Sequence, residues 1–114
     1  NAASYESFKY SFNYGPTAPS NTNHVSQTVE VQGGAQANAY AKCTSYSYTG
    51  NKPVLTVVSE SSAYPTNSTS FTGTTTSGQP MKYTEAIPPK YKTVTFRGSV
   101  SNYTSFIISA QVKG

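Results

Sequence analysis

Alternation of apolar and polar residues with a period of two runs through residues 24–48, longer than anywhere else in the chain. Three valines share one side of its first half, namely Val25, Val29 and Val31. Three tyrosines share one side of its second half, namely Tyr40, Tyr46 and Tyr48. The other side of that half carries small residues, which are Ala35, Ala37, Ala39, Ala41 and Cys43. The pattern predicts two strands that pair as a hairpin over the Gly33-Gly34 turn.

Shorter alternating stretches flank this predicted hairpin. Residues 4–14 place large aromatic side chains on one side, namely Phe8, Tyr10, Phe12 and Tyr14. We predict that this strand shares a core with the alanine side, because bulky and small residues together fill space well. Residues 54–58 are apolar on both sides, which predicts a central strand.

The C-terminal third of the chain predicts further strands. Residues 81–86 form one, and residues 93–101 form another in which Gly98 suggests a bulge. In residues 105–113, the predicted inward side is apolar and consists of Phe106, Ile108, Ala110 and Val112. Seven or eight strands joined by short turns predict an all-β fold. We expect one domain over residues 1–114, an antiparallel β-sandwich or, as the alternative, a flattened barrel.

Residues 61–80 are nearly all small and polar. The stretch reads as a loop or an edge hairpin around Phe71. The alternative is a membrane-inserting hairpin of a pore-forming protein, in which apolar residues alternate outward. Only Phe71 could face lipid there, so we favour the loop.

Composition supports strands and limits the function classes. The 114 residues include 17 Ser, 16 Thr and 10 Tyr but no Asp, and the net charge is +4. A low charged fraction of 11% argues against a nucleic-acid binder, which needs a dense basic surface. No apolar run reaches the roughly 18 to 20 residues that a membrane helix needs. The polar composition is typical of a secreted protein whose signal peptide has been removed, so we expect an extracellular location.

The chemistry-bearing residues are few. Hydrolases need paired carboxylates or a nucleophile with a base, whereas this chain has four Glu, one His and one Cys. In the predicted hairpin His24 comes near Cys43, but a cysteine among alanines is usually a small apolar residue. We therefore predict that the protein is not an enzyme and holds no metal or other cofactor.

Binding is the remaining class of function. Tyr40, Tyr46 and Tyr48 are expected on the side opposite the alanines, with Lys42 between them. Aromatic faces can stack on sugar rings, and a lysine can contact an anionic group. These four residues are our predicted binding site. The alternative is that the tyrosines only cover a two-sided sheet.

Residues 37–44, with the sequence ANAYAKCT, resemble a strand of the lactococcin 972 class of bacteriocins. The stretch before it, residues 24–29 (HVSQTV), is similar to the strand that precedes it in that family, with one residue more. The resemblance covers residues 10–49, and Tyr40 stands where the family has Trp. It implies a secreted all-β antibacterial that acts on cell-wall precursors. It implies no individual binding residue.

Three functional hypotheses follow. The first is a secreted protein that binds the cell envelope or glycans, bacteriocin-like in its action. The second is a fibre or coat subunit, in which the N-terminal or C-terminal strand pairs with another copy of the chain at an open edge. The third, which we rank last, is a small pore-forming protein. The expected partner is a cell-wall precursor or a glycan, and a homo-oligomer is the alternative assembly.

Overall fold

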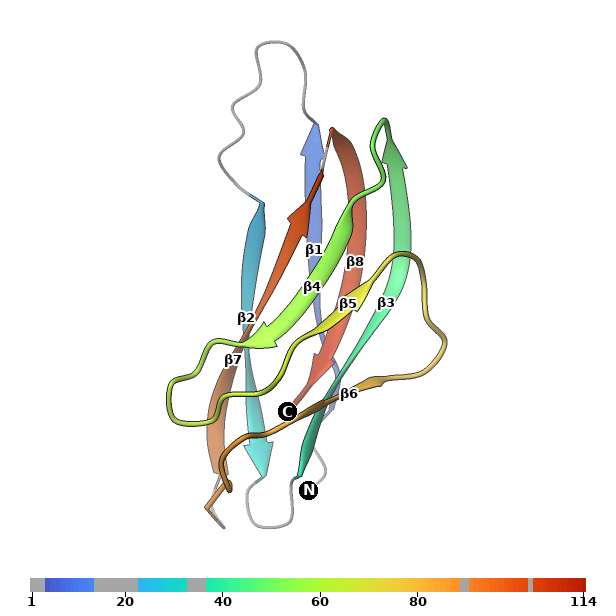
Figure 1. Cartoon of the computed structure of the whole chain (residues 1–114). Helices are drawn as coiled ribbons and strands as arrows, with labels where there is room; N and C mark the ends of the chain where they lie inside the picture. The colour runs from blue at the N-terminus through green and yellow to red at the C-terminus, as the bar shows by residue number, and fades with distance from the viewer. Residues whose placement is uncertain (1–3, 14–22, 33–36, 89–90, 103) are drawn as a thin grey trace.

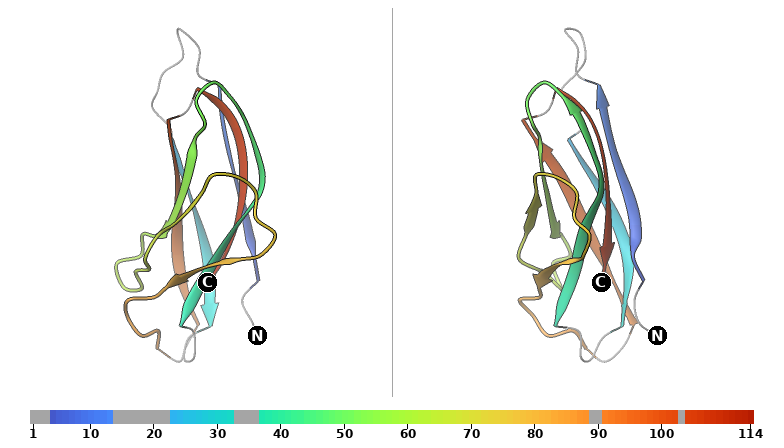
Figure 2. Two further views of the ribbon diagram at one scale, coloured as in Figure 1. Left: turned by 45° about the vertical axis from the view of Figure 1, so that its right-hand side comes forward. Right: turned by 90° about the vertical axis from the view of Figure 1, so that its right-hand side faces the viewer.

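The computed structural model of the chain describes residues 4–13, 23–32, 37–88, 91–102 and 104–114. In this part of the chain the strands are β1 (Glu6–Asn13), β2 (His24–Gln32), β3 (Asn38–Thr49), β4 (Val54–Ser59), β5 (Thr69–Phe71), β6 (Gln79–Lys82), β7 (Tyr91–Ser101) and β8 (Ser105–Lys113). They form two antiparallel sheets of four strands that pack face to face (Figures 1 and 2). We call β1-β8-β3-β6 the first sheet and β2-β7-β4-β5 the second sheet. The predicted all-β sandwich is confirmed.

The strand pairing is nested. β1 pairs with β8, β2 with β7, β3 with β6, and β4 with β5. This is the pairing of a jelly roll, in which one long hairpin is wrapped into two sheets. β1 begins and β8 ends at the same end of the sandwich (Figure 1). Among the residues described, no helix has the length and apolarity needed to cross a membrane.

The hairpin predicted for residues 24–48 is wrong. β2 belongs to the second sheet, where it pairs with β7, whereas β3 lies between β8 and β6 in the first sheet. The chain therefore crosses from one sheet to the other between these strands. Gly33-Gly34 and Ala35 lie outside the described residues. The alternation correctly indicated strands but not their partners.

The alternation does identify the core. Ala39, Ala41 and Cys43 are fully buried, and Phe8 and Tyr10 belong to the same core, as predicted. Both sets lie in the first sheet, however, so they do not face each other across the sandwich. The second sheet supplies the bulk that faces the first, with the buried side chains of Leu55, Val57, Phe71 and Phe96. Ala37 is exposed, and Tyr14 lies outside the described residues.

Gly98 makes room for the aromatic residues of β1. It does not form the expected bulge, because β7 pairs with β2 and β4 in unbroken register there. A Cβ at Gly98 would overlap the Tyr10 hydroxyl and lie 2.9 Å from Phe8 Cε2. The Tyr10 hydroxyl donates to the Val25 carbonyl across the open side of the sandwich, at 3.1 Å. The glycine therefore permits the contact that joins β1 to β2.

Residues 61–80 form edge structure. β5 pairs with β4 in the second sheet, and β6 pairs with β3 in the first. Asn67 ties this segment to β6, because its Oδ1 accepts from the Lys82 amide at 2.8 Å. Phe71, the residue that could have faced lipid, is buried with 3% of its surface exposed. The segment therefore lies at the edges of both sheets, and it is not a hairpin around Phe71, because β5 and β6 belong to different sheets.

The two terminal strands differ in their surroundings. β8 lies between β1 and β3 and is paired on both sides, so the predicted open edge at the C-terminal strand is wrong. β1 lies at the edge of the first sheet, and its one partner there is β8.

Candidate functional site

A β-bulge in β3 changes which side chains face outward. Cys43 pairs with Ala110, but Ser45 pairs with Ser109, so Thr44 is an extra residue. One extra residue exchanges the two faces of a strand because side chains alternate. The bulge therefore divides β3 into halves of opposite orientation.

The four predicted site residues fall on either side of this bulge. Before it, Tyr40 and Lys42 lie opposite to the buried alanines and point outward. After it, Tyr46 and Tyr48 pair with the inward-facing positions of β8. The prediction that all four share one face is wrong. Their role in binding stays a prediction.

Tyr40 and Lys42 join a cluster at one end of the first sheet, together with Tyr5 and Lys113. The Lys42 Nζ lies 4.3 Å from the centre of the Tyr5 ring, and the Lys113 Nζ lies 5.1 Å from it. Lys113 also lies 5.0 Å from the Tyr40 ring centre. We call these four residues the Tyr–Lys cluster. Two ammonium groups on one aromatic ring form a positive site beside an apolar surface.

The Tyr5 side chain extends from the β1 side of this end of the sheet towards β3 and β6. It stands just before β1 but reaches over the neighbouring strands to Gly78, where a Cβ would overlap its hydroxyl. Burial, and to a lesser degree the neighbouring Tyr40, raise the pKa of Tyr5. Its hydroxyl therefore stays protonated at neutral pH and can donate a hydrogen bond.

The charged side chains described on the outer face of the first sheet are all basic. By alternation and register, four of the eight cationic residues point outward from it, namely Lys9, Lys42, Lys82 and Lys113. None of the outward positions described on this face carries a carboxylate. The positive potential of this face is therefore not neutralised by acidic residues within it.

The second sheet has a different outer face. Its hydroxyl groups bond to one another, with Thr28 and Thr95 at 2.9 Å and Thr56 and Ser70 at 3.1 Å. Ser26 donates to the Glu60 carboxylate at 2.9 Å. These hydroxyls are already engaged, and the charges there are mixed. The first sheet is the better candidate for an anionic ligand.

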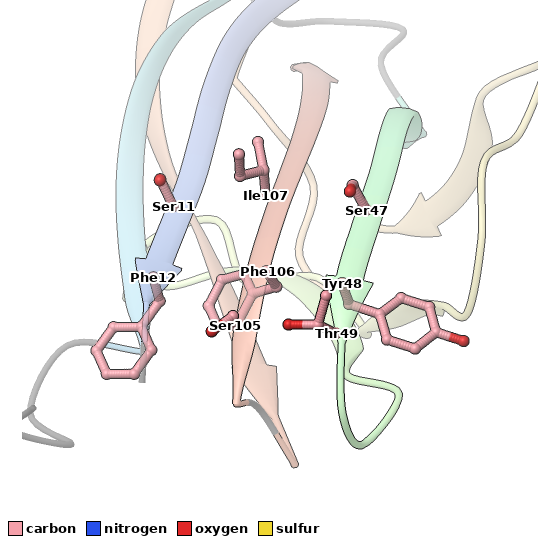
Figure 3. Close-up of a pocket in the computed structure, with 8 residues that line it drawn as sticks. All are labelled: Ser11, Phe12, Ser47, Tyr48, Thr49, Ser105, Phe106 and Ile107. Carbon is pink, nitrogen blue, oxygen red and sulfur yellow. The ribbon is translucent and has the colours of Figure 1, made fainter. Parts of the chain in front are cut away.

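A hollow of about 310 Å³ lies at the other end of the first sheet, over β1, β8 and β3 (Figure 3). Its apolar lining consists of Phe12, Tyr48, Phe106 and Ile107. Its hydroxyl-bearing lining consists of Ser11, Ser47, Thr49 and Ser105. We call it the strand-end pocket. Its lining contains no charged side chain, in contrast to the Tyr–Lys cluster.

Aromatic contacts fix the shape of this pocket. Phe12 and Phe106 stack with ring centres 5.8 Å apart, and Tyr46 meets Tyr48 edge to face at 5.9 Å. Tyr46 is held in place because its hydroxyl donates to the carbonyl of the buried Pro53. Tyr48 remains 39% exposed. Tyr46 thus has a structural position, whereas Tyr48 lies where a ligand can reach it.

Cys43 and His24 are not brought together. Cys43 is fully buried in the first sheet, its thiol donates to the Ser45 carbonyl at 3.3 Å, and burial raises its pKa. His24 is exposed on the second sheet. In the described ranges, no three His, Cys, Asp or Glu residues are grouped where they could hold a metal ion. The first sheet offers instead non-covalent contacts: aromatic faces, ammonium groups and hydroxyls.

Sequence reasoning missed Tyr5 and Lys113 as members of the cluster. Tyr5, Ser7 and Lys9 alternate on one side of the first strand, which was a usable signal of an outward face. Lys113 could be found only from the register in which β8 lies between β1 and β3.

Comparison with protein-family models, with curated proteins and with solved structures finds no match for this chain.

Proposed function

We propose that this is a secreted protein that binds an anionic glycan of the cell envelope through the outer face of the first sheet. The observation that carries the proposal is the Tyr–Lys cluster, in which Lys42 and Lys113 both lie against the Tyr5 ring. An anionic group placed between the two ammonium groups would form charge-assisted hydrogen bonds. The Tyr40 and Tyr5 rings offer apolar surface for an adjoining sugar ring.

The distribution of charge supports an anionic ligand over a neutral one. Four outward lysines lie on the face without a carboxylate, while Glu30 and Glu60 lie on the side of the second sheet. Such a face attracts a polymer with repeated negative charges and orients the protein on it. The attraction should weaken with salt, because the Debye length falls from about 10 Å at 0.1 M to about 3 Å at 1 M.

The test is co-sedimentation with purified bacterial cell walls, either intact or chemically stripped of their anionic polymers. We expect retention on intact walls at low salt, with clearly less on stripped walls and at high salt. Replacement of both cluster lysines by Lys42→Gln and Lys113→Gln should weaken binding by at least about tenfold, since a hydrogen bond to a charged group contributes about 1.5–3 kcal/mol.

The matched control is Lys52→Gln, which removes one charge from the exposed turn between β3 and β4. It should bind as the unaltered protein does. Equal loss in Lys52→Gln and in a single Lys42→Gln variant would mean that net charge alone matters, which contradicts the assignment to this face. No retention on intact walls at low salt would reject the function.

An antibacterial action is the finer form of this proposal. Tyr40 and Lys42 lie within the stretch that resembles the lactococcin 972 class, and that resemblance stays a prediction. Growth inhibition of Gram-positive cells by the unaltered protein, lost in the double lysine variant, would support it.

The second candidate function is a fibre or coat subunit. The observation in its favour is β1, an edge strand of eight residues with one partner in its sheet. An edge of this length can pair with another copy. Sedimentation across a range of concentrations decides between the two, because a monomer at high concentration is incompatible with a fibre subunit.

A further inference from the structure

We propose that the open edge of β2 is a dimer interface, at which β2 of one copy pairs antiparallel with β2 of a second copy. The two second sheets would then join into one continuous sheet across a two-fold axis. The inference does not depend on the proposed glycan binding, because it concerns the other sheet.

The two sides of the sandwich are protected differently against edge pairing. β5 and β6, which end the sheets on one side, have three and four residues. On the other side β1 and β2 lie next to each other, with eight and nine residues (Figure 2). β1 carries Lys9, a residue type that hinders edge pairing, whereas β2 contains no Lys, Arg, Pro or Gly. Among the described residues, β2 pairs in its sheet with β7 alone and in unbroken register, so its edge is the least protected of the four.

Backbone hydrogen bonds show which residues of β2 are free to pair. The Val100 amide donates to the Asn23 carbonyl at 2.8 Å, and these residues continue the β2–β7 register. Because bonded pairs recur at every second residue of an antiparallel ladder, the odd-numbered residues of β2 direct their backbone groups to β7. Thr95, opposite Thr28, agrees with this, since both of its backbone groups bond to residues 60–61. The amide and carbonyl of Thr28 and its even-numbered neighbours therefore point to the open edge.

The sequence of β2 is self-complementary about Gln27, as a two-fold interface requires. With the axis at Gln27, each residue lies opposite a residue of matching chemistry in the second copy. His24 lies opposite Glu30, Val25 opposite Val29, and Ser26 opposite Thr28. The His24 imidazole can then donate to the Glu30 carboxylate of the other copy on the outer side, while valines meet on the inner side.

Gln27 decides between this register and its neighbours. It is half-buried, and it is the one polar side chain among the described inward positions of β2, where the others are valines. On the axis, the two Gln27 amides can donate and accept hydrogen bonds with each other. An axis at Ser26 or at Thr28 would set Gln27 opposite a valine of the other copy instead.

Sedimentation equilibrium tests the dimer, with Thr28→Pro as the variant. Proline removes the amide that faces the open edge and leaves the ladder to β7 intact. Thr28→Ala is the matched control, because it loses the same hydroxyl contact with Thr95 but keeps the amide. We expect a reversible monomer–dimer equilibrium that Thr28→Pro weakens by about tenfold or more and that Thr28→Ala leaves within about twofold. A strict monomer at every concentration, or equal dimerisation of the two variants, would overturn the interface.

Disulfide cross-linking tests the register, even if Thr28→Pro loses its fold. Two copies of residue 27 would lie about 4.5 Å apart between Cα atoms, within the range of a disulfide. Two copies of residue 28 would lie about 8 Å apart, which is too far. Under oxidised glutathione, Gln27→Cys should therefore form a covalent dimer and Thr28→Cys should not, while the native Cys43 is buried. No cross-link with Gln27→Cys, or equal cross-linking of both variants, would reject the axis at Gln27.

Two further outcomes separate this inference from the other proposals. Lys42→Gln alters the first sheet and should leave dimerisation unchanged, so that loss of wall binding and loss of the dimer are independent results. Species that grow beyond the dimer with concentration would favour the fibre candidate and overturn a closed dimer.

Discussion

Tyr10 and Tyr83 are two buried tyrosines whose hydroxyls differ in their surroundings. Tyr10 is 4% exposed, and its hydroxyl donates to the Val25 carbonyl. Tyr83 is 6% exposed, and its buried hydroxyl has no hydrogen-bond partner among the described residues. A buried polar group without a partner costs about 1–3 kcal/mol, whereas a satisfied hydrogen bond contributes about 1 kcal/mol. The same deletion of one oxygen should therefore have opposite effects at the two positions.

We predict that Tyr83→Phe raises the free energy of unfolding by about 1 kcal/mol and that Tyr10→Phe lowers it by a similar amount. Urea unfolding at neutral pH, followed by circular dichroism, measures both. A Tyr83→Phe variant as destabilised as Tyr10→Phe would show that the Tyr83 hydroxyl has a partner.

The pH dependence should distinguish the Tyr83→Phe variant as well. Burial raises the pKa of Tyr83 from 10.0 to about 12. Between these values the unfolded chain loses the hydroxyl proton while the folded protein keeps it. Folding stability is thus fully present below about pH 10 and falls as the pH rises towards about 12. Tyr83→Phe should lose less stability in this window than the unaltered protein.

At the scale of the element, β3 shows what the sequence could and could not predict. From Ala39 to Cys43 the small residues at odd positions correctly marked the buried side. After Cys43 the odd positions remain small, as Ser45 and Ser47, so the alternation of size continues through the bulge and conceals it. The change from alanine to serine at these positions was the signal in the sequence that the buried side changes after Cys43. Because the bulge could not be recognised from the sequence, Tyr46 and Tyr48 could not be assigned to the inner side of the sheet.

The bulge should be essential to the fold. Deletion of Thr44 would restore strict alternation, so that either Ala39 and Ala41 or Tyr46 and Tyr48 must change faces. We predict a loss of about 3 kcal/mol or more in unfolding free energy, or no cooperative unfolding at all. Thr44→Ala is the matched control, since it keeps the residue count and removes only the hydrogen bond to the Ser109 carbonyl. Its loss should stay below about 1 kcal/mol. A deletion variant as stable as Thr44→Ala would contradict the inference that the bulge lets the two halves of β3 bury opposite faces.

At the scale of the whole molecule, the jelly roll explains why strand pairing could not be predicted. Local alternation indicates which side of each strand is buried, and that information is sufficient for a sandwich. The pairing of β1 with β8 or β2 with β7 joins residues from opposite ends of the chain, which no local pattern specifies. The Tyr–Lys cluster depends on this pairing, because Tyr5 and Lys113 meet Tyr40 only when β8 lies between β1 and β3. Half of the cluster was therefore predictable and half was not.

The nested pairing also predicts the order of folding. β4 and β5 form the innermost pair and close the shortest loop, while β1 and β8 close the longest, and loop-closure entropy favours the short loop first. Leu55 of β4 and Ile108 of β8 are both fully buried, so replacement of either by alanine should cost about 2–5 kcal/mol. We expect Leu55→Ala mainly to slow folding and Ile108→Ala mainly to accelerate unfolding, in stopped-flow measurements over a range of urea concentrations. If Ile108→Ala instead mainly slowed folding and Leu55→Ala mainly accelerated unfolding, the chain ends would pair before the β4–β5 hairpin forms.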